Sequence, residues 1–474
     1  MLAVAFALHF RPWQGGLLEE WGFALTWQDR GFGALSDFVG ATIGRPFHLV
    51  PAYIGLVISN GGFFGMYLVL GIISVGQVVA AAWALRPVLG GSIIPWIFGL
   101  IIAIHPWWAA GDVLRFMPAQ FSCLLFVLWL GFSVRLLRGA SGLWLIGVVA
   151  TPVVSLLSYQ ALALVYLLAM VALVAAMTVS PVRRIVDYVV ATVAAVALAT
   201  VYSIFLAPRL FDAPYEASLM SGSHDLVGSI HIVAHTARVY GKVGLVAMAI
   251  AAFALIVIAV VRRVGWVRIT LLTLVGPVGL LSALSYAATT LHLNDPERVM
   301  FPIGTAAWLT GFAALLLYSA APPEERRRAA LATVALAAAV SIAFAALNLE
   351  QWARFSGLQQ QTLALLEPIV ADTPADSTLV VVDQSGLLGD VYTFYPPHLQ
   401  YASRVTFDNN PTPVELCTDD STPRRHDIAA RYPLTTTQSC SAVLSPDARL
   451  VAVGIIGDGA AKVYEQPTAV VVAK

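Results

Sequence analysis

The chain has 474 residues, of which 59% are hydrophobic and only 11% are charged. Soluble domains carry roughly 25% charged residues, so a water-soluble fold of this length could not hide so much apolar surface. The 27 basic residues balance the 27 acidic ones, and no basic run carries interleaved aromatic residues. The composition excludes an ordinary soluble protein, gives no support for a nucleic-acid partner, and indicates a protein embedded in the lipid bilayer.

Apolar runs recur along most of the chain. A bilayer core of about 30 Å requires roughly 20 mainly apolar residues per helix. The runs that approach or meet this length are 63–85, 93–105, 117–134, 143–157, 161–179, 185–206, 243–261, 269–287, 301–318 and 329–347. Residues 1–10 are apolar but short, and they lack the basic start and cleavage site of a signal peptide. We interpret them as the outer part of a truncated first helix, which predicts about 11 transmembrane helices.

Basic residues collect in alternate loops, and this pattern predicts the orientation. Cytoplasmic connections of membrane proteins carry an excess of Lys and Arg. The loops that carry it here contain Arg86, Arg135, Arg138, Arg183, Arg184, Arg262, Arg263, Arg268 and Arg326 to Arg328. We therefore predict a multi-pass plasma-membrane protein with a cytoplasmic N-terminus, a long first outside loop at 11–62, and an extracytoplasmic C-terminal region.

The composition changes after the last apolar run. Residues 350–369 have the pattern of an amphipathic helix, and β-branched runs follow at 379–383, 449–457 and 469–473. We predict a transmembrane domain at 1–348 and a small extracytoplasmic α/β domain at 349–474. Cys417 and Cys440 both lie in this tail, so an exported tail would allow a disulfide between them.

The first outside loop holds the best acidic pair, Glu19 and Glu20, with Asp29 downstream. A carboxylate near the outer membrane face could act as a general base that takes a proton from an attacking hydroxyl group. The alternative interpretation is ordinary solvated charge in a loop.

Three arginines lie in outside segments, next to apolar sequence. They are Arg45 in the sequence GRP, Arg115, and Arg298. Arginine binds phosphate through two parallel hydrogen bonds, but it also anchors helix ends at the lipid surface. Asp112 lies three residues before Arg115, so the two could either pair with each other or bind a ligand.

Motifs of other reaction classes are weak or missing. The sequence HIVAH places His231 and His235 on one helical face, but the glutamate of the zinc-protease motif is absent, so we predict no metal site there. No phosphate-binding P-loop and no G-x-S-x-G nucleophile motif is found.

The order of these features resembles membrane glycosyltransferases of the GT-C class, and most of all the O-antigen or cell-wall glucosyltransferase type. The resemblance covers roughly residues 1–318. It is carried by an acidic pair after the first helix, then G-R-P, then an acidic residue with Arg-Phe in the second outside loop. The matching residues are Glu19, Glu20, Gly44, Arg45, Pro46, Asp112, Leu114, Arg115 and Phe116, with Ser158, Tyr159 and Arg298 as looser matches. The family usually has aspartates where this chain has Glu19 and Glu20.

The resemblance implies an enzyme that moves a hexosyl or pentosyl group, with inversion, from a polyprenyl-phosphate donor. The acceptor would be a cell-envelope glycan or lipid at the outer face of the membrane. The implied roles are a base among the acidic residues, phosphate binding by the arginines, and substrate contacts from Asp112 and Tyr159. No cofactor is named by the sequence, and a divalent cation is retained as an option.

Two other classes fit the composition. A transporter or flippase would place charges inside the spans along a substrate path, whereas the long cores here are almost free of charge. A membrane scaffold whose tail binds a partner is the third interpretation. The sequence does not identify the sugar, the acceptor, the linkage or the oligomeric state.

Overall fold

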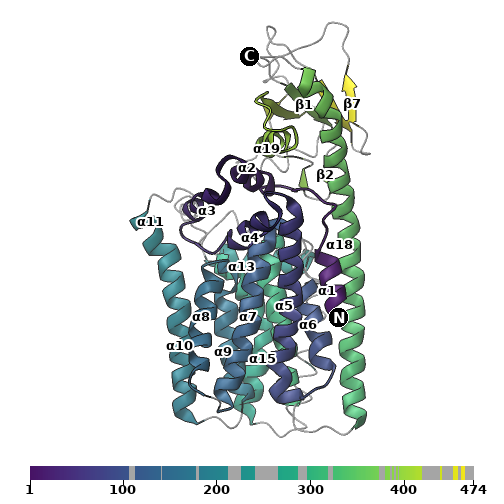
Figure 1. Ribbon diagram of the computed structural model, residues 1–474. Coiled ribbons are helices and arrows are strands. Elements are labelled where there is room, and N and C mark those ends of the chain that lie inside the picture. The colour runs from purple at the N-terminus through teal and green to yellow at the C-terminus, as the bar shows by residue number, and fades with distance from the viewer. Residues whose placement is uncertain are drawn as a thin grey trace. The chain divides into compact units, whose positions relative to one another are not determined.

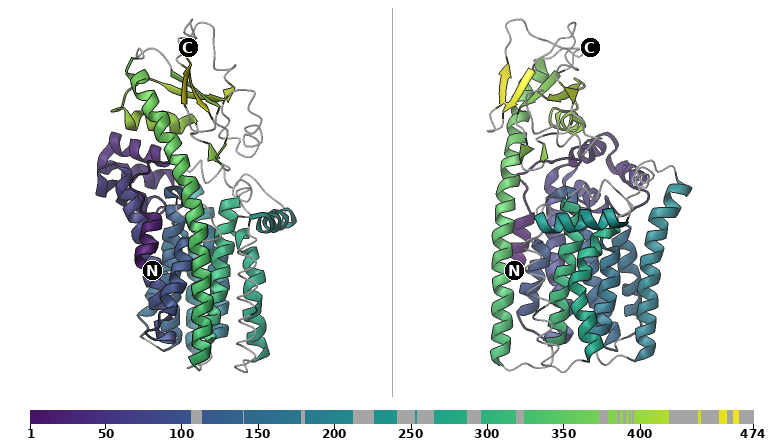
Figure 2. Two further views of the ribbon diagram at one scale, coloured as in Figure 1. Left: turned by 90° about the vertical axis from the view of Figure 1, so that its right-hand side faces the viewer. Right: turned by 180° about the vertical axis from the view of Figure 1, so that it is seen from behind.

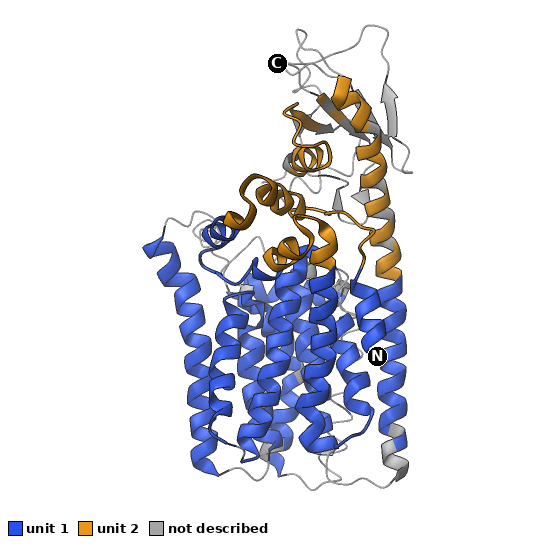
Figure 3. Ribbon diagram, viewed as in Figure 1, with its two compact units in different colours: residues 1–10, 35–51, 68–346 blue, residues 11–34, 52–67, 347–474 orange. Residues whose placement is uncertain are grey.

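The computed structural model describes residues 1–105, 113–139, 141–177, 181–211, 226–240, 253, 265–286, 296–318, 324–372, 379–384, 387–388, 391–392, 394, 396–418, 438–439, 452–456 and 461–464. The chain divides into two compact units, coloured in Figure 3. Unit 1 comprises residues 1–10, 35–51 and 68–346, and unit 2 comprises residues 11–34, 52–67 and 347–474. Each unit is described by itself.

Unit 1 is a bundle of long helices that run side by side (Figures 1 and 2). Its helices are α1 (Leu2–His9), most of α3 (Ala34–Ala41), most of α5 (Phe63–Leu89), α6 (Ile94–Ile104), α7 (Met117–Leu137), α8 (Trp144–Leu156), α9 (Ala163–Ala176), α10 (Val182–Val201), α11 (Ala207–Leu210), α13 (Leu226–Tyr240), α15 (Trp266–Leu280), α17 (Pro296–Tyr318) and the first part of α18 (Glu324–Asp372). Short single turns flank them at η2 (Leu114–Phe116), η3 (Gln160–Leu162), η4 (Tyr202–Leu206) and η5 (Leu281–Tyr286).

Glycines end two of these helices. Gly90 follows α5 with φ +63°, and Gly139 follows α7 with φ +93°. A positive φ lets the chain leave a helix while its last carbonyl groups are still satisfied, and only glycine adopts it without steric cost. The helices α6 and α7 begin with a proline in the first turn, where the missing N–H group costs no hydrogen bond.

Five described helices are long and apolar enough to cross a bilayer. They are Phe63–Leu89, Leu114–Leu137, Val182–Leu210, Arg298–Leu317 and Ala330–Glu350. Shorter apolar helices occur at Val50–Ser59, Ile94–Ile104, Trp144–Leu156, Gln160–Ala176 and Ile269–Ser285. The predicted run 243–261 falls almost entirely outside the described residues, so the total of about 11 stays a prediction.

Pairs of polar side chains link neighbouring helices inside the bundle. The Gln77 side-chain amide on α5 donates to the Gln120 backbone oxygen and to its Oε1 on α7, both at 2.8 Å. Ser122 Oγ on α7 lies 2.7 Å from Ser155 Oγ on α8. Buried polar groups need such partners, because neither lipid nor apolar side chains can hydrogen-bond to them.

Unit 2 combines segments from residues 11–67 with the C-terminal region. Its helices are α2 (Glu20–Arg30), η1 (Gly31–Gly33), most of α4 (Val50–Ser59), the last part of α18, and α19 (Pro396–Thr406). Residues 11–62, predicted as a long connection outside the membrane, contain α2, α3 and α4, and their location outside the membrane stays a prediction. The predicted amphipathic helix at 350–369 is the C-terminal part of α18, which continues without a break from the apolar run at 329–347.

The strands of unit 2 form one mixed sheet and one short hairpin. The sheet has the order β5-β4-β1-β6-β7, in which β1 pairs in parallel with β4 and β6, and β6 pairs antiparallel with β7. The strands are β1 (Leu379–Gln384), β4 (Val414–Thr418), β5 (Gln438–Ser439), β6 (Ala452–Ile456) and β7 (Ala461–Tyr464), with β2 (Leu387–Leu388) and β3 (Val391–Tyr392) in the hairpin. The strand prediction at 379–383 is confirmed as β1, and residues 452–456 of the predicted run 449–457 form β6. The rest of that run and 469–473 lie outside the described residues.

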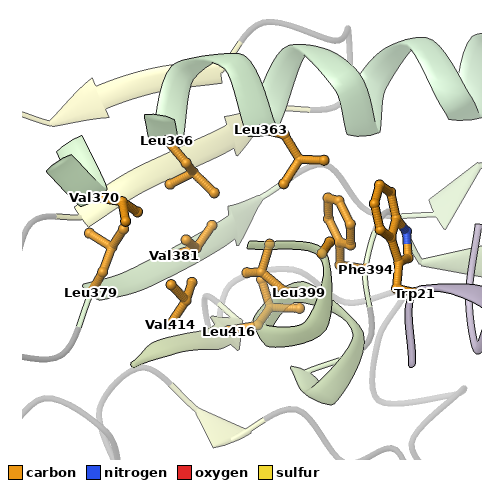
Figure 4. Packing of buried hydrophobic residues seen from close by; sticks show 11 residues of the cluster. Trp21, Leu363, Leu366, Val370, Leu379, Val381, Phe394, Leu399, Val414 and Leu416 are labelled. Atoms are coloured by element: carbon orange, nitrogen blue, oxygen red, sulfur yellow. The ribbon is translucent and has the colours of Figure 1, made fainter. Parts of the chain in front are cut away.

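A hydrophobic core joins α2, α18, α19 and the sheet within unit 2. Figure 4 shows Trp21 of α2 beside Phe394, with side chains from α18, β1 and β4 around them. The buried members are Trp21, Leu363, Leu366, Val370, Leu379, Val381, Phe394, Leu399, Ala402, Val414 and Leu416. This core explains why α2, far earlier in the sequence, belongs to the same unit as the C-terminal region. The predicted domain boundary after 348 stays a prediction.

Candidate functional site

Three segments of unit 1 are joined by hydrogen bonds where loops enter and leave the bundle. The Phe47 backbone N–H donates to the Leu157 carbonyl at 3.2 Å, and His48 Nδ1 lies 2.7 Å from the Ser158 carbonyl oxygen. Ser158 Oγ donates to the Pro118 carbonyl, at 3.4 Å, in the first turn of α7. These bonds fix the GRPFH segment against the short loop after α8 and against the start of α7.

Aromatic contacts bring the start of α17 to the same place. The rings of His48 and Tyr159 are stacked, with centroids 6.1 Å apart and an interplanar angle of 13°. Tyr159 also makes an edge contact with Phe301 of α17 at 5.8 Å. Tyr159 is buried, so it packs between the GRPFH segment and α17.

Two of the predicted phosphate-binding arginines share one aromatic ring. The Arg115 Cζ lies 5.4 Å from the centroid of the Phe116 ring, and the Arg298 Cζ lies 6.0 Å from it. A cation that lies within about 6 Å of the centroid of an aromatic ring is attracted to the face of that ring. Phe116 is buried at the start of α7, so it holds two guanidinium groups from different segments near each other.

The third arginine, Arg45, lies in a tight turn. Its backbone N–H donates to the Thr42 carbonyl at 2.7 Å, and its carbonyl accepts from the His48 N–H at 2.8 Å. The Arg45 side chain is only 4% exposed. The turn places the Arg45 guanidinium and the His48 imidazole on one short segment.

Arg45 and Arg298 act together on His48. Burial of the ring lowers the pKa of His48 well below its usual value, and the positive charges of Arg45 and Arg298 lower it further. All three effects favour the neutral form of the His48 ring. Because a carbonyl oxygen only accepts, the ring proton is on Nδ1, and Nε2 is the unprotonated nitrogen. The group formed by Arg45, His48, Arg115 and Arg298 is called the arginine cluster below.

The predicted acidic residues belong to unit 2. Glu20 is fully buried at the first turn of α2, where its Oε2 accepts from the backbone N–H groups of Leu17 at 3.1 Å and Leu18 at 2.7 Å. Within the described part of the chain its Oε1 has no hydrogen-bond partner. Burial, and then the charge of Glu19, raise the pKa of Glu20 to about 7, against the lowering effect of the backbone N–H groups.

The loop before Glu20 is held by side chains of unit 2. Gln359 and Gln360 of α18 donate to the carbonyls of Leu17, at 2.9 Å, and Trp13, at 2.8 Å. The Tyr67 hydroxyl lies 3.0 Å from Gln14 Oε1. The position of the buried carboxyl group is therefore set by α18 as well as by its own helix.

The other acidic candidates have different surroundings. Asp29 is at the last turn of α2, about 13 Å along the axis from Glu20, and pairs with Arg404 of α19 at 3.6 Å. Its side chain is 41% exposed. Glu19 immediately precedes α2 and is half-buried. The structure thus separates Asp29 from the Glu19 and Glu20 pair.

Several predictions fall outside the described residues. These are Asp112, Cys440 and the side chain of Cys417, so the substrate contact and the disulfide stay predictions. Among the described residues, no group of three or more His, Cys, Asp or Glu side chains could hold a metal ion.

No sequence motif singles out His48. The available signal was its position three residues after Arg45, which is the spacing of a turn. Its importance comes from the Ser158 carbonyl and from Arg298, both distant in the sequence, so local pattern alone did not single it out.

The fold of the chain is shared with solved structures of another protein. No family model matches the sequence, and no curated protein matches it. Two solved structures of ArnT from Cupriavidus metallidurans share the fold. The one bound to undecaprenyl phosphate gives a TM-score of 0.52 at 14% identity and covers 95% of this chain and 92% of ArnT. The one in the apo state gives 0.53 at 13% identity, with 96% and 91% covered.

Proposed function

We propose that this chain is a membrane glycosyltransferase that moves a sugar from a polyprenyl-phosphate donor to a cell-envelope glycan or lipid. Transfer takes place at the outer face of the plasma membrane. The N-terminus is cytoplasmic and the C-terminal region is extracytoplasmic, as the distribution of basic residues indicates. The fold shared with ArnT, one structure of which holds undecaprenyl phosphate, supports this proposal.

The arginine cluster is the observation that carries the proposal. Arg45, Arg115 and Arg298 come from three segments and are linked through His48 and Phe116. Guanidinium groups bind phosphate oxygens in pairs of parallel hydrogen bonds. The apolar helices next to the cluster suit a donor whose long tail lies in lipid. The arginines would hold the donor phosphate and stabilise the negative charge that grows on it as the sugar leaves.

The reaction needs a base. The acceptor hydroxyl loses its proton to a carboxylate as its oxygen attacks the anomeric carbon, and the bond from that carbon to the phosphate oxygen breaks with its electron pair leaving on the polyprenyl phosphate. This single displacement inverts the anomeric configuration. Glu20 is our first candidate for the base, because a pKa of about 7 suits proton transfer near neutral pH. Glu19 and Asp29 are the other candidates.

Other roles follow from the same proposal. Asp112 and Tyr159 contact the sugar or the acceptor, and Cys417 and Cys440 form a disulfide in the exported tail. The need for a divalent cation is tested by running the reaction with a chelator and with added Mg²⁺ or Mn²⁺.

The deciding experiment measures sugar transfer from polyprenyl-phosphate sugars in membranes that contain the full chain. Wild type is compared with Glu19→Gln, Glu20→Gln and Asp29→Asn at equal protein levels. Loss of a positioned base lowers the rate about 10²- to 10⁴-fold. We expect that loss for Glu20→Gln and not for Asp29→Asn.

Arginine variants test the donor site. Arg45→Lys and Arg298→Lys keep the charge but lose the planar two-bond geometry, so each is expected to weaken donor binding, whereas Arg183→Lys at an exposed position is the control. No transfer from any donor, combined with movement of a lipid-linked substrate across the bilayer, would replace the proposal with transport.

A further inference from the structure

A π turn, η4, connects α10 to α11 (Figure 1). The Ala207 N–H donates to the Tyr202 carbonyl, five residues back, whereas a regular α-helix closes this bond over four residues. Pro208 follows, and because proline has no N–H it cannot donate to the Ile204 carbonyl, so the regular hydrogen-bond ladder is interrupted here. The extra residue of a π turn changes the direction of the side chains beside it, and such turns are frequent at functional sites.

Tyr202, the first residue of this turn, reaches the segment that carries Arg45. Its hydroxyl donates to the Ile43 carbonyl at 3.0 Å. That carbonyl belongs to the peptide group that joins Ile43 to Gly44, directly before Arg45. Gly44 has no side chain that could fix the backbone by packing, so hydrogen bonds from other segments set the position of this turn. Tyr202 therefore holds the backbone from which the Arg45 side chain extends.

Ser203, the next residue, reaches the loop after α8. It is buried, and its Oγ accepts a hydrogen bond from the side-chain amide of Gln160. Gln160 directly follows Tyr159, whose ring stacks on that of His48. The loop after α8 is thus bound both to the π turn and to the segment 43–48. Each of these three segments is joined to the other two, which makes the position of the Arg45 turn depend on all of them.

We infer that Tyr202 is a positioning residue of the phosphate site, which acts through the Ile43 carbonyl to hold Arg45 in place for the donor phosphate. This inference rests on the proposed binding of the donor phosphate by Arg45. An arginine that is held in place before the phosphate binds loses less conformational freedom on binding, so the affinity is higher. One hydrogen bond of this kind changes an equilibrium constant by about 2- to 10-fold.

The test uses the purified full chain in lipid nanodiscs and measures the affinity for farnesyl methyl phosphate, a lipid phosphodiester. Tyr202→Phe removes the hydroxyl and keeps the ring, and it is expected to weaken binding about 2- to 10-fold. Tyr188→Phe is the matched control, because it removes the same atom from α10 about 21 Å along the helix axis. It is expected to bind as wild type does. Thermal unfolding is measured on every variant.

A double-mutant cycle separates positioning from a general effect on the protein. Arg45→Gln is expected to weaken binding of the probe, and Tyr202→Phe added to it should weaken binding no further, because the hydroxyl acts through Arg45. If the two losses multiply instead, Tyr202 acts independently of Arg45 and the inference is wrong.

A rescue experiment tests the hydrogen bond itself. Incorporation of 4-aminophenylalanine at position 202 restores a neutral donor at the end of the ring, and it should recover part or all of the affinity that Tyr202→Phe loses. Affinity that stays at the level of Tyr202→Phe contradicts the inference.

The remaining outcomes distinguish this inference from the proposed function. Full affinity in Tyr202→Phe, when Arg45→Gln binds weakly, overturns the inference and leaves the phosphate site intact. Loss of folding in Tyr202→Phe but not in Tyr188→Phe also overturns it, because the hydroxyl would then stabilise the whole bundle. Absence of binding by wild type, or binding that Arg45→Gln does not weaken, overturns the proposed role of Arg45 and this inference together.

Discussion

The guanidinium group of Arg135 lies over the indole ring of Trp83, with its Cζ 3.7 Å from the ring centroid. The same side chain donates to the Trp83 carbonyl at 2.8 Å and to the Gly131 carbonyl at 3.1 Å. One arginine therefore joins α7 to α5 through stacking and through hydrogen bonds.

Arg135→Lys is expected to lower the stability of unit 1 by about 1–2 kcal/mol, because an ammonium group cannot stack on Trp83 and reach both carbonyls. The measurement is thermal unfolding of the purified protein followed by tryptophan fluorescence. Arg138→Lys is the control, since Arg138 is exposed and its loss should cost within about 0.5 kcal/mol. Equal melting temperatures for the two variants would contradict this assignment.

Close backbone contact between α4 and the start of α5 makes Gly55 intolerant of a side chain. A methyl group at Gly55 would lie 2.5 Å from the Met66 Cα, and backbone cannot move aside as a flexible side chain can. Gly55→Ala should therefore destabilise unit 2 by roughly 1–3 kcal/mol. Gly40→Ala on α3 meets nothing within 4 Å and should be neutral or stabilise by up to about 1 kcal/mol. Thermal unfolding of both variants tests this expectation. A Gly55→Ala variant as stable as wild type would contradict the close contact between α4 and α5.

The buried carboxyl group of Glu20 makes stability depend on pH. Its pKa rises from 4.5 to about 7 in the folded state, so the folded protein binds the proton more tightly than the unfolded chain. The contribution of Glu20 to the free energy of unfolding consequently falls as the pH rises from about 4.5 to about 7, and is constant above that. Glu20→Gln keeps the acceptor for Leu17 and Leu18 but removes the charge. It should exceed wild type in stability above pH 7 by at most about 3 kcal/mol, with little difference near pH 4.5.

Unfolding at several pH values tests this expectation. Glu415→Gln, at an exposed position on β4, serves as the control. Its difference from wild type in the free energy of unfolding should not grow as the pH rises. If the free energies of unfolding of Glu20→Gln and wild type differed by the same amount at every pH, folding would not raise the pKa of the Glu20 carboxyl group.

If the proposed function is correct, the pH dependence of sugar transfer should depend on the same carboxyl group. If Glu20 is the base, kcat/KM rises with pH and becomes constant above about pH 7, because the carboxylate form is required. Glu19→Gln should move this rise to lower pH, because the charge of Glu19 contributes to the raised pKa of Glu20. The measurement is the pH dependence of initial transfer rates. A rise centred near pH 4, or one that Glu19→Gln leaves in place, would assign the base to another residue.

Much of the fold was predictable from the sequence. Apolar runs such as 117–134 and 301–318 predict the helices α7 and α17, because a chain in lipid must satisfy its backbone hydrogen bonds within each helix. The β-branched run at 379–383 likewise predicted β1. The helices of 11–62 were not predicted, because α2 is stabilised by packing against distant parts of unit 2 and because neither α2 nor α4 has a long apolar run of its own.

The sequence by itself determined where the helical spans lie. It also determined that arginines occupy the segments predicted to lie outside, and that acidic residues occupy the first of these segments. Tertiary structure alone decided their chemistry. Arg45 and Arg298 are 253 positions apart in the sequence, and the contacts of Tyr159 with His48 and with Phe301 bring the segment of Arg45 and the start of α17 together. The acidity of Glu20 likewise depends on burial, which removes water from the carboxyl group. The sequence pattern shows the composition and the periodicity of each segment. Charge interactions and desolvation depend instead on distances between groups, and only the folded chain sets those distances.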